Sequence, residues 1–114
     1  MRRFPSIKDN CEFREIYEKG RTRADRNLVL YVRPRATGEA RIGISASKKI
    51  GNSVVRHRVT RLLREVFRLH RSALSVSCDL VFVVRKDGAM QDYHAIEASF
   101  LKLCRAQGIL EEGK

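Results

Sequence analysis

The residues best suited to chemistry lie in the segment 48–71, KKIGNSVVRHRVTRLLREVFRLHR. It contains eight Lys or Arg residues and one acidic residue, Glu65. On a helix with about 100° per residue, one face collects basic side chains, namely His57, Arg61, Arg64, Arg68 and Arg71. A guanidinium group can grip two phosphate oxygens at once and can stack on bases. Because a solvated helix face normally mixes both signs of charge, this pattern predicts contact with a polyanion.

The whole chain carries the same excess of positive charge. Its 114 residues include 24 Lys or Arg and 13 Asp or Glu, which gives a net charge of +11 at pH 7. A field of this strength attracts polyanions and makes their binding sensitive to salt. Nucleic acid is the first expected partner. An anionic membrane surface, an acidic protein, and a basic domain with no nucleic-acid role are the alternatives.

The residues before this helix add to the basic surface. Lys48 and Lys49 lie in a predicted loop, and Gly51 lets the backbone turn and approach a partner closely. Asn52 or Ser53 is expected to cap a helix over residues 53–71, and a helix N-terminus itself favours an anion. The opposite face of the helix is apolar and is expected to pack on the rest of the fold through Val55, Val59, Leu62, Leu63, Val66 and Leu69.

A first helix is predicted over residues 9–19. Asp9 and Glu12 fit a capping box, and Gly20 is placed for a left-handed C-cap. One face of this helix carries Phe13, Ile16 and Tyr17.

Three strands and a last helix complete the prediction. Strands at 27–33 and 40–46 are joined by a short connection, which favours an antiparallel hairpin. Residues 79–85 read as a strand buried on both faces. A turn at 86–88 then leads to a helix over residues 91–106, and Gly108 lies beyond its end. The order αββαβα predicts one α+β domain over residues 1–114, a sandwich with a small mixed sheet.

No catalytic constellation is visible in the sequence. The cysteines Cys11, Cys78 and Cys104 are scattered, and His70 and His94 have no partner at the spacing of a metal site or a triad. Acidic residues of the first helix are explained by capping and surface charge. No apolar run approaches the ~20 residues that span a bilayer, and no secretory signal is recognisable. We therefore expect no membrane contact and a cytoplasmic location.

The run RIGISASKKIGNSVVRHRVTRLLR, residues 41–64, closely resembles the "RNR" signature of the bacterial ribonuclease P protein family. The spacing of Phe13, Tyr17 and Gly20 in the first helix, and the strands at 28–31 and 79–85, also fit. The likeness covers nearly the whole chain.

The resemblance implies the fold of the second domain of ribosomal protein S5, with a left-handed βαβ crossover. It implies a protein subunit that binds a catalytic ribonuclease P RNA and the 5′ leader of precursor tRNA, and that assists cleavage at the mature 5′ end. Catalysis would be carried out by the RNA with Mg²⁺ held chiefly by that RNA. The protein would have no catalytic residue, no activity alone and no obligate protein partner.

The resemblance also assigns residues to these contacts. The leader cleft maps to Phe13, Tyr17 and Tyr31. The RNA-binding set is Lys48, Lys49, Gly51, Asn52, Arg56, His57, Arg58, Arg61, Arg64 and Arg68. His57 departs from the middle Asn of the signature, and Thr60 stands where Lys is common. Thr60 removes one positive charge, so the resemblance gives less support to a leader or metal contact at this position.

Two other functions compete with this one. A basic ribosomal or ribosome-assembly protein explains charge, size and fold class, but not the signature. A stand-alone nuclease needs acid–base residues or metal ligands that the sequence does not offer.

Overall fold

The computed structural model describes residue 7 and residues 10–36, 38–74 and 77–110. Along the chain the elements are α1 (Asn10–Lys19), β1 (Arg21–Ala24), β2 (Leu28–Pro34), β3 (Arg41–Ser45), the 3-10 turn η1 (Lys48–Ile50), α2 (Ser53–His70), the 3-10 turn η2 (Arg71–Ala73), β4 (Cys78–Val84), α3 (Lys86–Ala89) and α4 (Tyr93–Ala106). The predicted helices and strands are therefore present, with ends that differ by a few residues. The capping role predicted for Asp9 lies outside the described residues.

The strands form one four-stranded mixed sheet in the order β1-β2-β4-β3. Strand β4 pairs antiparallel with β2 and parallel with β3. The parallel β3-α2-β4 unit and the α+β class agree with the sequence prediction. The left-handed sense implied by the resemblance for this crossover stays a prediction.

The hairpin predicted between the strands at 27–33 and 40–46 is wrong, because β4 lies between the corresponding strands, β2 and β3. Six of the seven residues of β4 are buried, with only Val83 partly exposed. Such a strand belongs in the middle of a sheet, where it has a neighbour on each side. The gain from burying β4 between two strands is therefore larger than the preference of a short connection for placing β2 next to β3.

Strand β1 was missed because its sequence, Arg-Thr-Arg-Ala, shows no apolar alternation and all four residues are exposed. It pairs with one edge of β2, with Arg21 opposite Val32 and Ala24 opposite Val29. The side-chain amide of Gln107, at the end of α4, donates to the carbonyl oxygen of Arg21 at 2.9 Å. Backbone pairing and hydrogen bonds to Gln107 hold this strand, and neither leaves a pattern in the sequence.

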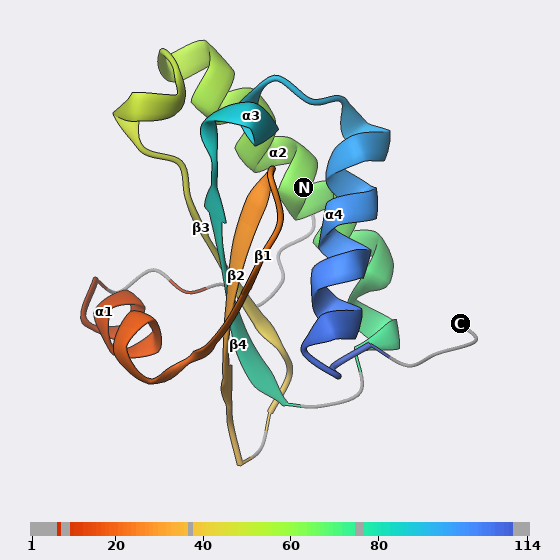
Figure 1. Ribbon diagram of the computed structural model, residues 1–114. Coiled ribbons are helices and arrows are strands. Elements are labelled where there is room, and N and C mark those ends of the chain that lie inside the picture. The colour runs from red at the N-terminus through yellow and green to blue at the C-terminus, as the bar shows by residue number, and fades with distance from the viewer. Residues whose placement is uncertain (1–6, 8–9, 37, 75–76, 111–114) are drawn as a thin grey trace.

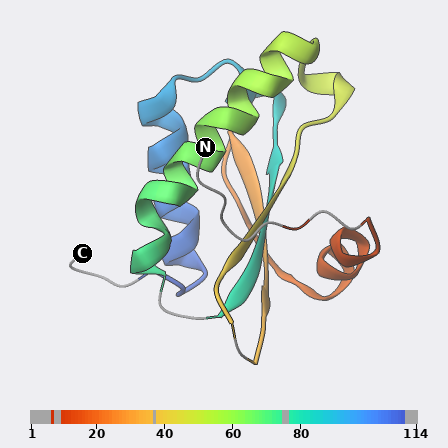
Figure 2. The ribbon, with the colours of Figure 1, turned by 180° about the vertical axis from the view of Figure 1, so that it is seen from behind.

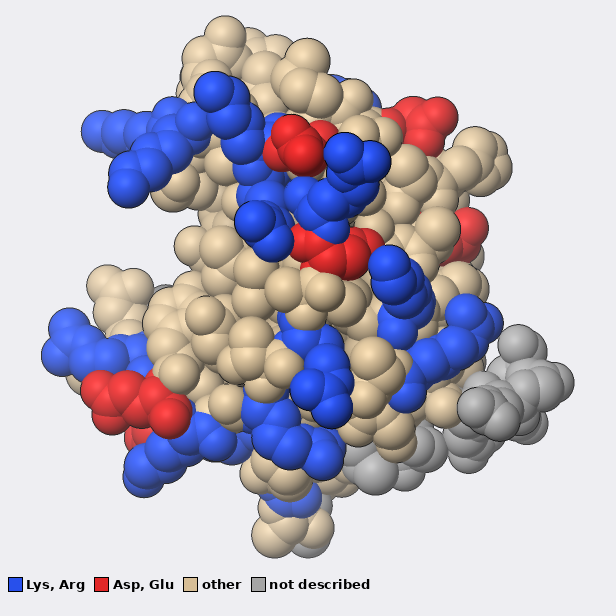
Figure 3. Space-filling view, in the orientation of Figure 1, with Lys and Arg blue, Asp and Glu red and all other residues tan. Residues whose placement is uncertain are grey.

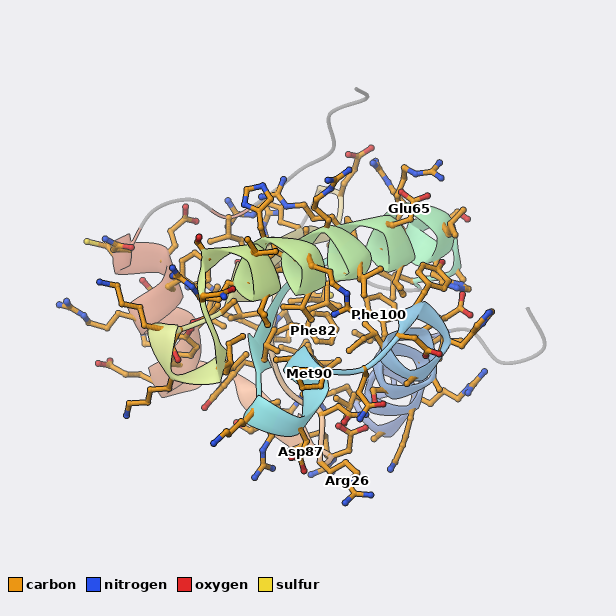
Figure 4. The ribbon with its side chains drawn as sticks, turned by 90° about the horizontal axis from the view of Figure 1, so that it is seen from above. Arg26, Glu65, Phe82, Asp87, Met90 and Phe100 are labelled. Carbon is orange, nitrogen blue, oxygen red and sulfur yellow. The ribbon has the colours of Figure 1, made fainter. Side chains whose placement is uncertain are left out.

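The molecule has three layers: α1 alone on one face of the sheet, the sheet itself, and α2 with α4 on the other face (Figures 1 and 2). The main core lies under α2 and α4. Phe82 of β4 stacks on Phe100 of α4 with ring centroids 5.0 Å apart, and both are fully buried (Figure 4). Such a pair adds about 0.5–1.5 kcal/mol to the gain from burial alone.

Helix α2 buries Val59, Leu63 and Val66 as predicted, and Phe67 as well. Leu69 was assigned to the same face but is 50% exposed, because it lies in the last turn, past the edge of the packed stripe.

Three local details differ from or extend the prediction. Gly20 does not adopt the left-handed conformation; a Cβ there would lie 2.6 Å from the carbonyl oxygen of Ile16, so close packing explains this glycine. Gly108 does adopt positive φ, 74°, just after α4. The predicted turn at 86–88 is the short helix α3.

Replacement of Gly88 by Ala is expected to destabilise the fold. A Cβ at Gly88 would lie 2.2 Å from the carbonyl oxygen of Asn27, a backbone atom that also accepts from the amide of Arg85. Forced separation of packed groups costs about 1–3 kcal/mol, measurable by urea denaturation. Gly108→Ala is the comparison, because it meets no atom within 4 Å and introduces only backbone strain. A Gly88→Ala protein as stable as the wild type would contradict this packing.

Candidate RNA interface

The basic surface begins at η1, between strand β3 and helix α2. The side chain of Ser47 accepts from the amide of Lys49, and Lys48 and Lys49 are exposed. At Gly51, φ is 156°, and a Cβ would lie 2.9 Å from side-chain atoms of Val55. The lysines are thus presented by a tightly built turn.

Helix α2 starts directly after this turn, as predicted. The side chain of Asn52 accepts from the amide of Val55 at 3.0 Å, which confirms Asn52 and not Ser53 as the cap. This bond uses the carboxamide oxygen of Asn52 for folding and leaves its NH₂ group for a partner.

The outward face of α2 carries His57, Arg61, Arg64 and Arg68, all exposed. In the view from above, nitrogen-tipped side chains project from α2 away from the sheet (Figure 4). Arg68 is hydrogen-bonded to Glu65, with Nε 3.1 Å from Oε2. Among the described residues, no acidic side chain pairs with Arg61 or Arg64. These two are the arginines of the helix most available to an anion.

Two other arginines of the predicted set are placed differently. Arg58 donates to the backbone carbonyl oxygens of Ala89 and Gln91, at 3.1 and 2.5 Å, and so joins α2 to the α3–α4 turn. Arg56 is partly buried, and its Nε has no hydrogen-bond partner among the described residues. Arg58 is thus exposed but also serves the fold, whereas Arg56 is the one arginine of the predicted set that is partly buried.

A groove lies between α1 and the end of β3. It has a volume of about 420 Å³ and is lined by Asn10, Phe13, Arg14, Tyr17, Ile44 and Ser45. Two of the three predicted cleft residues line it. The third, Tyr31 of β2, is half-buried and lies beside Tyr17 in an edge-on contact, with ring centroids 4.9 Å apart. It supports the aromatic wall of the groove.

The groove has its shape because α1 sits very close to the sheet. A Cβ at Gly43 would lie 2.7 Å from the ring of Phe13, so only glycine leaves room for that ring. Sequence reasoning missed Arg14, which follows Phe13 and lies three residues before Tyr17, because that reasoning followed only the apolar residues of the helix.

A buried carboxylate fixes α1 on the sheet. Asp79 of β4 is fully buried and accepts from Arg41 Nε and from Arg33 Nη2, each at 2.8 Å. The same two arginines reach outward to α1. Arg41 donates to Glu12 at 2.6 Å, and Arg33 donates to Glu15 at 2.7 Å. Two arginines thus bridge a strand carboxylate and a helix. No local sequence motif predicts this contact.

The charge states of this network follow from its geometry. Burial raises the pKa of the Asp79 carboxyl, but hydrogen bonds from Arg41 and Arg33 outweigh burial and hold the pKa below its ordinary value of 3.8. Hydrogen bonds to Asp79, and then to Glu12, raise the pKa of the Arg41 guanidinium. Asp79 and Arg41 are therefore both charged at neutral pH.

The described residues contain no group of three His, Cys, Asp or Glu side chains that could hold a metal ion. None of their helices is long and apolar enough to cross a bilayer.

Fold and surface together define a small α+β protein with one strongly cationic helix. The family model for ribonuclease P matches residues 1–107. The ribonuclease P protein component of Desulforamulus reducens is 43% identical over 97 residues, 85% of this chain and 86% of that protein. That of Caldanaerobacter subterraneus is 44% identical over 106 residues, 93% of this chain and 91% of that protein.

A solved structure supports the same relationship. The ribonuclease P protein of Staphylococcus aureus matches with a TM-score of 0.87 and 30% identity, over 96% of this chain and all of that one. The chain therefore belongs to the family of bacterial ribonuclease P protein components, the protein part of a tRNA-processing endoribonuclease.

Asp79→Asn is expected to lower the free energy of unfolding at pH 7 by about 3 kcal/mol, because one partner of a buried ion pair is lost. Since the pKa of Asp79 in the folded protein is lowered, its contribution is fully present above the unfolded value near 3.8 and is lost as the pH falls through the lower folded value. The difference between variant and wild type should therefore shrink at acidic pH in urea titrations. Glu65→Gln, in an exposed pair, is the control and should leave stability at pH 7 unchanged. Equal stability of Asp79→Asn and wild type at pH 7 would contradict the role of the bridge.

Proposed function

We propose that η1 and α2 bind the catalytic RNA of ribonuclease P, and that the groove beside α1 receives the 5′ leader of precursor tRNA. The observation that carries this proposal is the exposed cationic face that begins at Lys48 and Lys49 and continues through Arg61 and Arg64 of α2. The turn η1 and helix α2 present these charges from a regular backbone, so the backbone need not be ordered when they meet a phosphate chain. Release of counterions from that backbone then favours binding.

The groove suits a single RNA strand. Phe13 and Tyr17 offer aromatic faces, with ring centroids 6.2 Å apart, and Arg14 adds a positive charge at the same wall. Stacking of an unpaired base on an aromatic ring contributes about 1–3 kcal/mol with little sequence preference. Such tolerance is what an enzyme that processes many different leaders needs.

The two sites are neighbours along the chain. Ser45 lines the groove, and Lys48 begins the basic turn three residues later. A strand that leaves the groove at this end meets the lysines of η1, which lie beside the RNA held on α2. The proposal thus places leader and catalytic RNA on adjoining surfaces of one small protein.

Cleavage itself is assigned to the RNA. In this proposal, the Mg²⁺ that cleavage requires is held chiefly by the partner RNA. The protein contributes binding and orientation. We place it in the cytoplasm, where the buried thiols of Cys78 and Cys104 would stay reduced.

The decisive experiment is reconstitution of precursor-tRNA cleavage at low magnesium with the cognate RNA alone, the protein alone, and both. The protein should be inert alone and should restore activity to the RNA at near-physiological salt. Cleavage by RNA-free protein would refute the assignment of catalysis. Binding without restored activity would instead favour a ribosomal or ribosome-assembly role.

Arg61→Ala and Arg64→Ala should each weaken binding of the catalytic RNA and reduce the slope of log K against log salt by about 1, the loss expected for one phosphate contact. Filter binding over a salt series measures both effects. Lys19→Ala, which lies on α1 across the sheet from α2 (Figure 1), removes one charge and should keep the slope. Unchanged slopes in both arginine variants would exclude phosphate contacts by this face.

Tyr17→Ala should weaken binding of leader-bearing precursor tRNA to the holoenzyme by about tenfold, as loss of one stacking contact predicts. The tyrosine side chain is already 37% exposed, so the fold should tolerate its removal. Mature tRNA without a leader is the control substrate, and its binding should not change. Equal losses on both RNAs would place Tyr17 outside a leader site.

A further inference from the structure

The opposite edge of the sheet carries a second basic surface, apart from η1, α2 and the groove. It is formed by β1, the residues that follow it, α3 and the outward face of α4. The edge surface, as we name it, comprises the exposed residues Arg21, Arg23, Arg26, Arg85, Lys86, Lys102 and Arg105. Figure 3 shows basic side chains over this part of the molecule with fewer acidic ones among them.

The packing of β1 against α4 brings these side chains onto one continuous face. Arg21 and Arg23 lie opposite Val32 and Leu30 of β2, so they point to the side of the sheet that α4 covers. Arg21 also donates to the backbone carbonyl oxygen of Gln107, at 3.3 Å. Lys102 lies three residues before Arg105, on the same exposed face of α4.

Little of this charge is neutralised within the chain. Arg26 is 4.0 Å from Asp87 in a pair whose side chains are both largely exposed. Arg85 donates to a backbone carbonyl oxygen of Asp25, not to its carboxylate. Among the described residues, no acidic side chain is within salt-bridge distance of Arg23, Lys102 or Arg105.

Protection of an exposed strand edge explains only part of this pattern. Charged side chains on an edge discourage pairing with a strand of another molecule, and Arg21 and Arg23 would suffice for that. Lys102 and Arg105 lie on helix α4, which a strand of another molecule cannot extend as it could extend a sheet. Their alignment with the strand arginines points to a ligand that spans both elements.

We infer that the edge surface binds the phosphate backbone of a second segment of the catalytic RNA, distinct from the segment held by α2. This inference rests on the proposed function of α2. Helices α2 and α4 lie side by side on the same face (Figure 2), so an RNA seated on α2 can continue over α4 to β1. The groove is at the β3 edge, far from β1 in the strand order, so a leader seated there is not the occupant.

When the RNA is already bound to α2, even a weak second contact at the edge surface adds to the affinity. Once the RNA is held there, binding at the edge surface is intramolecular and benefits from a high local concentration. Arginine and lysine side chains that reach only phosphates impose no sequence requirement. The edge surface therefore orients the RNA relative to the protein without reading its bases.

The test is the double variant Arg23→Gln/Lys102→Gln in binding and footprinting of the cognate RNA. Its affinity should fall several-fold near 0.15 M salt, and the slope of log K against log salt should fall by about 1–2, as two lost phosphate contacts require. Hydroxyl-radical protection should disappear from one RNA segment and persist in the segment that Arg61→Ala exposes.

Two control variants distinguish direct contact with the RNA phosphates from the effect of the protein's overall positive charge. Arg23→Lys/Lys102→Arg keeps both charges and should retain affinity and protection. Lys19→Gln removes one charge elsewhere and should leave the footprint intact. An unaltered footprint in Arg23→Gln/Lys102→Gln, with a slope like that of Lys19→Gln, would overturn the inference. Since footprinting reports binding alone, failure of the protein to restore cleavage would count against the proposed function and not against the edge surface.

Discussion

Strand β4 is the constraint on which both candidate RNA sites depend. Its alternation sends Leu80 and Phe82 to the core under α2 and α4, and Asp79 and Val81 to the face that α1 covers. The first pair gives α2 a surface on which to lay its apolar stripe, which leaves its cationic stripe in solvent. The second pair fixes α1, and with it the wall of the groove. Because the side-chain period of a strand is two, a slip of one residue would exchange the two faces and disturb both sites.

The positive charge of this protein is used in two different ways. Some arginines serve the fold: Arg33 and Arg41 hold a buried carboxylate and a helix together, and Arg58 grips backbone carbonyls. Others, such as Arg61 and Arg64, keep their guanidinium groups in solvent. The first group contributes to stability because its partners are fixed and partly desolvated. Only the second group has its full hydrogen-bonding capacity left for phosphates.

The sequence was sufficient for much of the fold and for the basic helix, because both depend on local periodicity. The stripe of α2, the buried strand β4 and the cap at Asn52 all leave such patterns. Strand order depends instead on which strand buries most apolar surface when it has a neighbour on each side. Strand β1 is held by its pairing with β2 and shows no pattern of its own. The bridge at Asp79 joins residues 38 and 46 positions apart in the chain, so no spacing rule could find it. For the same reason, spacing could not show that Arg58 points to the α3–α4 turn while Arg61 faces solvent.

The arrangement also explains why the groove and the cationic helix would act together. Strand β3 forms one wall of the groove, and the chain passes from it through η1 into α2 without a flexible linker. The far wall, α1, is tied to β2, β3 and β4 through Arg33, Arg41 and Asp79. A rigid connection of this kind fixes where a single strand leaves the groove relative to an RNA on α2. Selectivity can then come from this fixed distance rather than from the identity of the bases, which sequence-tolerant stacking leaves open.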